Sequence, residues 1–319
     1  MTDQIRAPYV EGASDDLPTN DSGNPPFRVV AERALSRRGF LGGSAALAAS
    51  SALVGSVGAM VFAKNAEAAS LGTLTFESLP HRYDETHHVA KGYDADMLIR
   101  WGDKVVEGAP AFDPTKQSAA AQALQFGYNN DFIGYTPLPF GSGNPARGLL
   151  CVNHEYVDRE LMFPNAADRD PKTQSKEMVD VEMAAHGHSV LEIARDAKGK
   201  WSVVAGSAYN RRIHVGTEMR ISGPAAGHDR LKTSQDATGT RVLGTLNNCA
   251  GSITPWGTVL MAEENFNNYF AGDITKTKEA RAYKRLGVAG DVGYGWSRFH
   301  DRFDVEKEPN EANRFGWMV

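Results

Sequence analysis

Residues 189–205, SVLEIARDAKGKWSVVA, contain two runs of strand-forming residues joined by a turn. The runs SVLEIAR (189–195) and WSVVA (201–205) are rich in apolar and β-branched residues, and Gly199 lies in the turn between them. A glycine-containing turn between two such runs is typical of an antiparallel hairpin. We therefore expect the rest of the chain to consist of short strands joined by turns.

The same pattern recurs, while helical patterns are few. Further strands are expected at residues 94–101, 148–153, 258–262 and 314–319, and short helices at residues 118–126, 180–185 and 273–286. Strands at short intervals with many turns indicate an all-β protein built as a sandwich, barrel or propeller. The 32 glycines and 15 prolines agree with many turns.

Composition excludes several classes of protein. The 319 residues carry a formal net charge of -5, so no nucleic-acid partner is expected. Cys151 and Cys249 are the two cysteines of the sequence, too few for a disulfide scaffold. Cys151 lies within an apolar run and is expected in the core.

The N-terminal region has the pattern of an export signal. Arg37 and Arg38 precede an apolar run, residues 41–63, and then AEA at 66–68. This order predicts a disordered N-terminus and a twin-arginine signal peptide over residues 1–69, cleaved near Ala68 or Ala69. The alternative is a stable membrane anchor, but the run is rich in Gly, Ala and Ser. We expect a periplasmic or secreted protein without an anchor after cleavage.

Two polar clusters follow apolar runs and contain candidate metal ligands. Asn153, His154 and Glu155 follow the run 148–152, and Glu263 and Glu264 follow the run 258–262. Amide, imidazole and carboxylate groups bind hard or borderline cations. Adjacent strand residues point to opposite faces, so one of the two glutamates should face a given site. Each cluster also fits a solvated strand end.

Cysteine, histidine and arginine supply the remaining candidates. Cys249 stands in NNCAGS (247–252), where its thiolate could ligate a transition metal or act as a nucleophile; a buried free thiol is the alternative. His186 and His188 have the spacing of same-face strand residues but are more often structural. Arg211 is a weak candidate for a phosphate-binding catalytic residue.

Several motifs together resemble the PhoX-type alkaline phosphatases. The resemblance is carried by the twin-arginine signal and by Ile99–Asp103, Asn153–Tyr156, Ile221–Gly227, Asn247–Gly251, Thr254–Thr258 and Glu263–Phe266, in that order. It covers residues 70–319, which we expect to be the N-terminal part of a longer β-propeller phosphatase domain. The sequence ends abruptly in an apolar strand pattern at Val319, so a truncated form is expected.

The resemblance implies a six-bladed β-propeller that carries Ca²⁺ and Fe³⁺ and hydrolyses phosphate monoesters outside the cytoplasm. It implies that Cys249 ligates iron, and it places Glu155 and Glu263 or Glu264 in acidic segments like those of the family site. Asn153 completes the candidate ligand set. The implied partners are a small-molecule phosphate ester and the twin-arginine translocase, and the expected state is a monomer.

Two other functions fit the same sequence. One is an exported β-propeller that binds or scaffolds without catalysis. The other is a calcium-dependent hydrolase of a different ester.

Overall fold

The structure, a computed structural model, describes residues 78–290 and 293–319. The predicted signal peptide over residues 1–69 lies outside the described residues. The chain divides into two units, residues 1–94 and 95–319, and every helix and strand named below belongs to the second unit. No helix in the described part of the chain combines the length and apolar character needed to cross a membrane.

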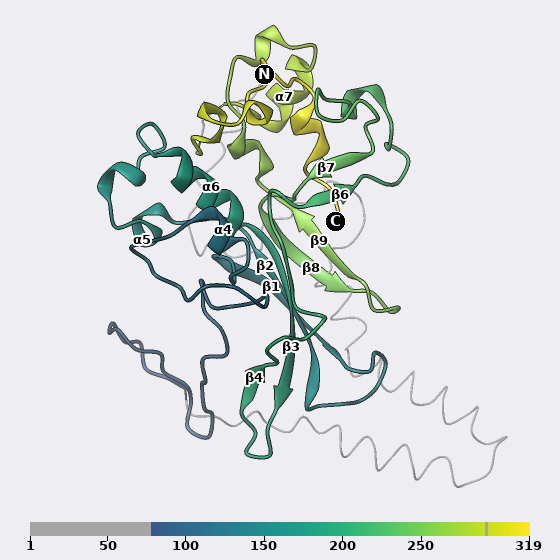
Figure 1. Ribbon diagram of the computed structural model, residues 1–319. Coiled ribbons are helices and arrows are strands. Elements are labelled where there is room, and N and C mark those ends of the chain that lie inside the picture. Colours follow the sequence, from purple (N-terminus) through teal and green to yellow (C-terminus); the bar gives the residue numbers. More distant parts are fainter. Residues whose placement is uncertain (1–77, 291–292) are drawn as a thin grey trace, which may run out of the picture. The chain divides into compact units, whose positions relative to one another are not determined.

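An open antiparallel sheet of five strands is the largest element of the second unit (Figure 1). Its strands are β1 Asn130–Pro137, β2 Arg147–His154, β3 Gly187–Arg195, β4 Trp201–Val203 and β5 Arg211–Ile213. They pair in the order β1-β2-β3-β4, and β5 also pairs with β3. The central strand β3 is buried along most of its length, so both faces of the sheet are covered around it.

Two hairpins accompany the sheet. They are β6 Glu218–Arg220 with β7 Arg241–Leu243, and β8 Asn248–Ile253 with β9 Val259–Glu263. The β8–β9 hairpin lies against β1 and β2 (Figure 1). The last residues of the chain continue this hairpin, because the backbones of Met261 and Val319 exchange two hydrogen bonds of 2.8 Å. The strand expected at residues 314–319 is thus reduced to an isolated bridge between Ala262 and Met318.

The α-helices are short, and α4, α5 and α6 begin at side-chain caps. They are α4 Ala119–Gln122, α5 Arg159–Met162, α6 Lys176–Ala185 and α7 Ala280–Leu286. Seven 3-10 helices are described at Ala166–Asp168, Asp229–Leu231, Phe266–Tyr269, Ile274–Lys276, Trp296–Arg298, Asp301–Phe303 and Glu311–Arg314. Ser175 caps α6, where its Oγ accepts a hydrogen bond from the backbone N–H of Met178.

Besides the strand expected at 314–319, two expected elements differ from the structure. The hairpin at 189–205 is observed as β3 and β4, and the helix at 118–126 as the single turn α4. Residues 95–101 form no strand, because Leu98 and Ile99 pack against a core cluster while the chain turns at Trp101. The helix expected at 273–286 is broken into a 3-10 turn and α7, which ends at Gly287 in the left-handed conformation.

Two apolar clusters hold the second unit together. The smaller one covers one face of the sheet and contains Val105, Phe126, Val152, Leu191 and Ile193. The larger one lies around α6 and the aromatic side chains of Tyr269, Tyr294, Trp296 and Phe303. Because Val152 faces the smaller cluster, its neighbours Cys151 and Asn153 point to the opposite face of β2.

The mostly-β class predicted from the sequence is confirmed. In the described residues the sheet is open and the other strands form two-stranded hairpins, so no closed sheet is present.

Candidate metal centre

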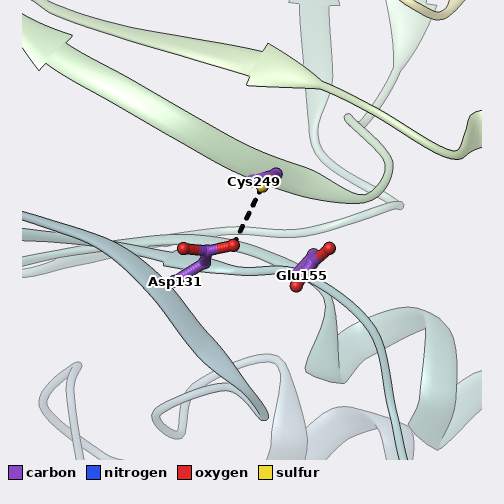
Figure 2. A group of neighbouring side chains, drawn as sticks. All are labelled: Asp131, Glu155 and Cys249. Carbon is purple, nitrogen blue, oxygen red and sulfur yellow. Dashed lines mark hydrogen bonds between the residues drawn. The ribbon is translucent and has the colours of Figure 1, made fainter. Parts of the chain in front are cut away.

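Three side chains with metal-binding atoms converge beside the β8–β9 hairpin. One carboxylate oxygen each of Asp131 and Glu155 and the Sγ of Cys249 lie within 4.8 Å of one another (Figure 2). Asp131 is exposed, and Glu155 and Cys249 are half-buried, so the group borders solvent. The Sγ of Cys249 donates a hydrogen bond of 3.0 Å to Oδ2 of Asp131.

Irregular backbone at strand ends brings these residues together. Asp131 lies in β1, where the pairing with β2 shifts register between Asn130 and Ile133. Cys249 lies in β8, where the pairing with β9 shifts between Asn248 and Gly251. Such bulges redirect side chains and interrupt the ladder of backbone hydrogen bonds.

Glu155 follows the end of β2 and is held at two points. Its backbone N–H donates to the carbonyl of Asn129 over 3.0 Å, and its Oε2 accepts a 3.2 Å hydrogen bond from the side-chain amide of Asn129. Asn129 therefore fixes the position of Glu155 beside the group.

The pKa values of Cys249 and Glu155 are both raised in this group. The hydrogen bond to Asp131, followed by that to Glu264, raises the pKa of the Cys249 thiol. Burial raises the pKa of Glu155, and the charges of Asp131 and Glu264 raise it further. Such a cluster is disfavoured when fully ionised unless a cation compensates it. The donor set therefore fits a bound cation.

Glu263, the last residue of β9, and the following Glu264 have different surroundings. Glu264 is exposed and close enough for its charge to act on Cys249 and Glu155. Glu263 points the other way and is engaged by four donors. These are Thr245 Oγ1 at 2.7 Å, Leu246 N at 2.9 Å, Gly316 N at 2.8 Å and Trp317 N at 3.2 Å. The structure thus brings Glu264, rather than Glu263, near the candidate ligands.

We expect the substitution Glu263→Gln to destabilise the fold by about 2 kcal/mol, because an amide NH₂ would face backbone N–H donors at a half-buried position. The matched control Glu264→Gln changes an exposed side chain and should alter the free energy of unfolding by less than about 0.5 kcal/mol. Denaturant titration of both variants measures the difference. Equal stability of the two variants would contradict the anchoring role of Glu263.

Asn153, a candidate ligand from the sequence, uses its amide inside the protein. Its Nδ2 donates to the carbonyls of Cys249 at 2.8 Å and Ala250 at 3.1 Å. Its Oδ1 lies 2.8 Å from Nδ1 of His188. The buried ring of His154 accepts a bond from Gly127 N–H at Nε2, so it also faces away from the group.

His186 and His188 do not share a face as their spacing predicted. Gly187 between them has φ +106, and a Cβ there would lie 2.2 Å from the carbonyl oxygen of Ile213. This backbone turn separates the rings. His188 lies against Asn153, whereas His186 bonds to the carbonyl of Glu182 over 2.7 Å and to the hydroxyl of Tyr269 over 2.9 Å.

We expect the neutral ring of His186 to make stability depend on pH. Burial lowers the pKa of His186 to about 4, whereas an unfolded histidine titrates near 6.5. Because the folded pKa is depressed, the unfolded chain binds the proton first, and stability is lost as the pH falls from about 6.5 towards 4.

The measurement compares the wild type with His186→Gln in denaturant titrations at pH 7 and pH 5. The variant lacks this proton linkage, so its free energy of unfolding should fall by about 2 kcal/mol less between the two pH values. An identical fall in both proteins would show that His186 takes up its proton equally in both states.

Arg211 and Cys151 lie outside the group. Arg211 is exposed on β5 and pairs with Val190 of β3. Its neighbour Arg212 is buried and donates to the carbonyls of Ala184 at 2.8 Å and His188 at 2.8 Å, which ties the end of α6 to the start of β3. Cys151 is buried in β2, as expected, and burial raises the pKa of its thiol to about 11.

Asp131 was not among the candidates from the sequence. It stands in NND at 129–131, at the polar start of β1. The signal that could have revealed it is an asparagine-rich polar segment at a strand end, which also surrounds Glu155 and Cys249.

Comparisons with known proteins agree with the resemblance found in the sequence. The family model described as "Alkaline phosphatase PhoX" matches residues 74–319. No curated protein matches the chain. Among solved structures, the chain is similar to "Pseudomonas fluorescens PhoX in complex with vanadate, a transition state analogue", with 43% identity and a TM-score of 0.69. The match covers 76% of this chain and 41% of that chain.

Proposed function

The chain belongs to the PhoX alkaline phosphatase family, and from this premise we propose that it supplies part of the metal centre of an exported phosphomonoesterase. The observation that carries the proposal is the convergence of Asp131, Glu155 and Cys249 within 4.8 Å. The similar solved structure is described as a complex with vanadate, a transition-state analogue, which supports a phosphate ester as substrate.

The donor set supports two kinds of cation. A thiolate at Cys249 suits a transition metal such as Fe³⁺, whereas the carboxylates of Asp131, Glu155 and Glu264 suit Ca²⁺. When bound, such cations would neutralise and orient a phosphate dianion and stabilise the charge on its oxygens.

The residues of this chain prepare the site in two ways. Asn129 holds Glu155 by its backbone and its side chain. The carboxylate of Asp131 accepts a hydrogen bond from the thiol of Cys249. The thiol must lose its proton before it binds a metal, and Asp131 is placed to receive that proton.

The wider setting is proposed from the family and from the signal sequence. We infer a six-bladed β-propeller, export by the twin-arginine translocase through Arg37 and Arg38, and a monomeric protein in the periplasm or secreted. A small phosphate monoester is the proposed substrate. Folded export agrees with a metal centre that is loaded before the protein crosses the membrane.

The direct test is hydrolysis of p-nitrophenyl phosphate by the protein expressed from its own gene, with iron and calcium supplied. We expect Glu155→Gln to lower kcat/KM by about 100-fold or more, since a ligand and its charge are lost. The control Glu160→Gln removes an exposed carboxylate on α5 and should retain activity. Full activity of Glu155→Gln, or an inactive wild type that contains both metals, would overturn the proposal.

A further inference from the structure

Cys249 lies in a segment of β8 that lacks the usual ladder partners. Between Asn248 and Gly251 the pairing with β9 shifts register, so Cys249 and Ala250 form the irregular part of the strand. A strand bulge leaves backbone groups without ladder bonds, and another group must satisfy them.

The side chain of Asn153 takes the place of the missing ladder. Its single NH₂ group donates to both backbone carbonyls of this segment, over 2.8 Å to Cys249 and 3.1 Å to Ala250. Asn153 is fully buried and comes from β2, so a residue nearly a hundred positions earlier in the chain fixes the backbone that carries the thiol.

The orientation of this amide decides whether the contact is attractive. If the amide were turned by 180°, its oxygen would face two carbonyl oxygens. His188 lies directly opposite Asn153 in the pairing of β2 with β3, and its Nδ1 is 2.8 Å from Asn153 Oδ1. Because Oδ1 can only accept, the proton of the neutral ring must be on Nδ1.

We propose that His188 is a positioning residue of the metal centre, because its Nδ1–H selects the amide orientation of Asn153 that holds Cys249 in place. This inference rests on the proposed function. Two hydrogen bonds connect the ring of His188 to the backbone carbonyl of Cys249, and His188 does not touch the group itself.

The position of His188 is itself fixed by the fold. Its backbone carbonyl accepts a 2.8 Å hydrogen bond from the buried guanidinium of Arg212. Its Nε2 is buried without a hydrogen-bond partner among the described residues, so the Asn153 contact is the polar interaction that its ring makes there. Burying Nε2 of His188 in this way costs free energy. The role of this ring in orienting the amide of Asn153 accounts for its presence.

The test compares two polar substitutions that place a nitrogen at different positions. In His188→Asn, the amide nitrogen takes nearly the place of Nδ1 and can still donate to Asn153. In His188→Gln, the longer side chain carries its nitrogen towards the former position of Nε2. Asn153→Asp is a further variant, which keeps the acceptor for His188 but replaces the donor that faces the Cys249 carbonyl.

The readout is binding of Co²⁺ to the full chain, followed by the thiolate-to-cobalt charge-transfer absorption. Outer contacts of this kind commonly change metal affinity by about 10- to 100-fold. We expect that loss in His188→Gln and Asn153→Asp, and a value within about 3-fold of the wild type in His188→Asn. The control His214→Leu removes a ring that accepts from Gly216 N–H and should leave the cobalt affinity unchanged.

The outcomes separate the inference from the function on which it rests. A thiolate band in the wild type that is absent from Cys249→Ser supports the metal centre. If His188→Gln and Asn153→Asp then bind cobalt as the wild type does, the positioning role is overturned while the centre stands. If the wild type shows no thiolate band, the metal centre fails and the inference fails with it.

Discussion

Replacing Trp296 with alanine should lower the free energy of unfolding by about 3 to 5 kcal/mol, the usual range for removing a buried tryptophan. The indole is fully buried and packs against Tyr269, Tyr294 and Phe303, with ring centroids 4.7, 5.1 and 5.0 Å away. Its Nε1 also donates a 2.8 Å hydrogen bond to the buried carboxylate of Glu182, which would lose a partner.

The matched control for this prediction is Trp256→Ala. Trp256 is 72% exposed, so its removal should change stability by less than about 0.5 kcal/mol. Guanidinium titration of both variants gives the comparison. A Trp296→Ala variant as stable as the control would contradict the larger core cluster described around α6.

Replacing Cys249 with serine should reduce the iron that remains bound after desalting, with an affinity lower by about 100-fold or more. The serine hydroxyl does not ionise near neutral pH, so the site would lose the one ligand that prefers a transition metal. Elemental analysis of the desalted protein measures this loss, and calcium, which binds oxygen ligands, should be affected less.

The control is Cys151→Ala. Cys151 is buried in β2 and lies outside the candidate group, so iron content should match that of the wild type. If Cys151→Ala lost its iron while Cys249→Ser kept it, the iron ligand would be Cys151 rather than Cys249.

Local sequence pattern predicted part of the regular structure. The hairpin at 189–205 formed as predicted because the turn residues and the apolar runs act over a few positions. The strand expected at 94–101 did not form, since pairing requires a neighbouring strand that the local sequence does not specify. The break in the helix expected at 273–286 follows from the cap at Asp273, whose side chain accepts from Thr275 N–H and starts a 3-10 turn.

The candidate site was predicted only in part, because long-range contacts decide which polar group faces it. The structure places Glu155 and Cys249 together, as their motifs implied, and adds Asp131 from another strand. The carboxylate of Glu263 accepts hydrogen bonds from residues 245–246 and 316–317. No local sequence pattern reveals these contacts. Asn153 is likewise drawn to the backbone of Cys249 by the packing of the β8–β9 hairpin against β2.

We propose that Cys249 ligates a transition metal together with the carboxylates of Asp131 and Glu155. The sharpest test is X-ray absorption at the iron edge, on protein purified from its own host. We expect one sulfur neighbour at bonding distance among oxygen neighbours, with the sulfur lost in Cys249→Ser. An iron shell made of oxygen and nitrogen alone, in folded wild-type protein, would contradict it.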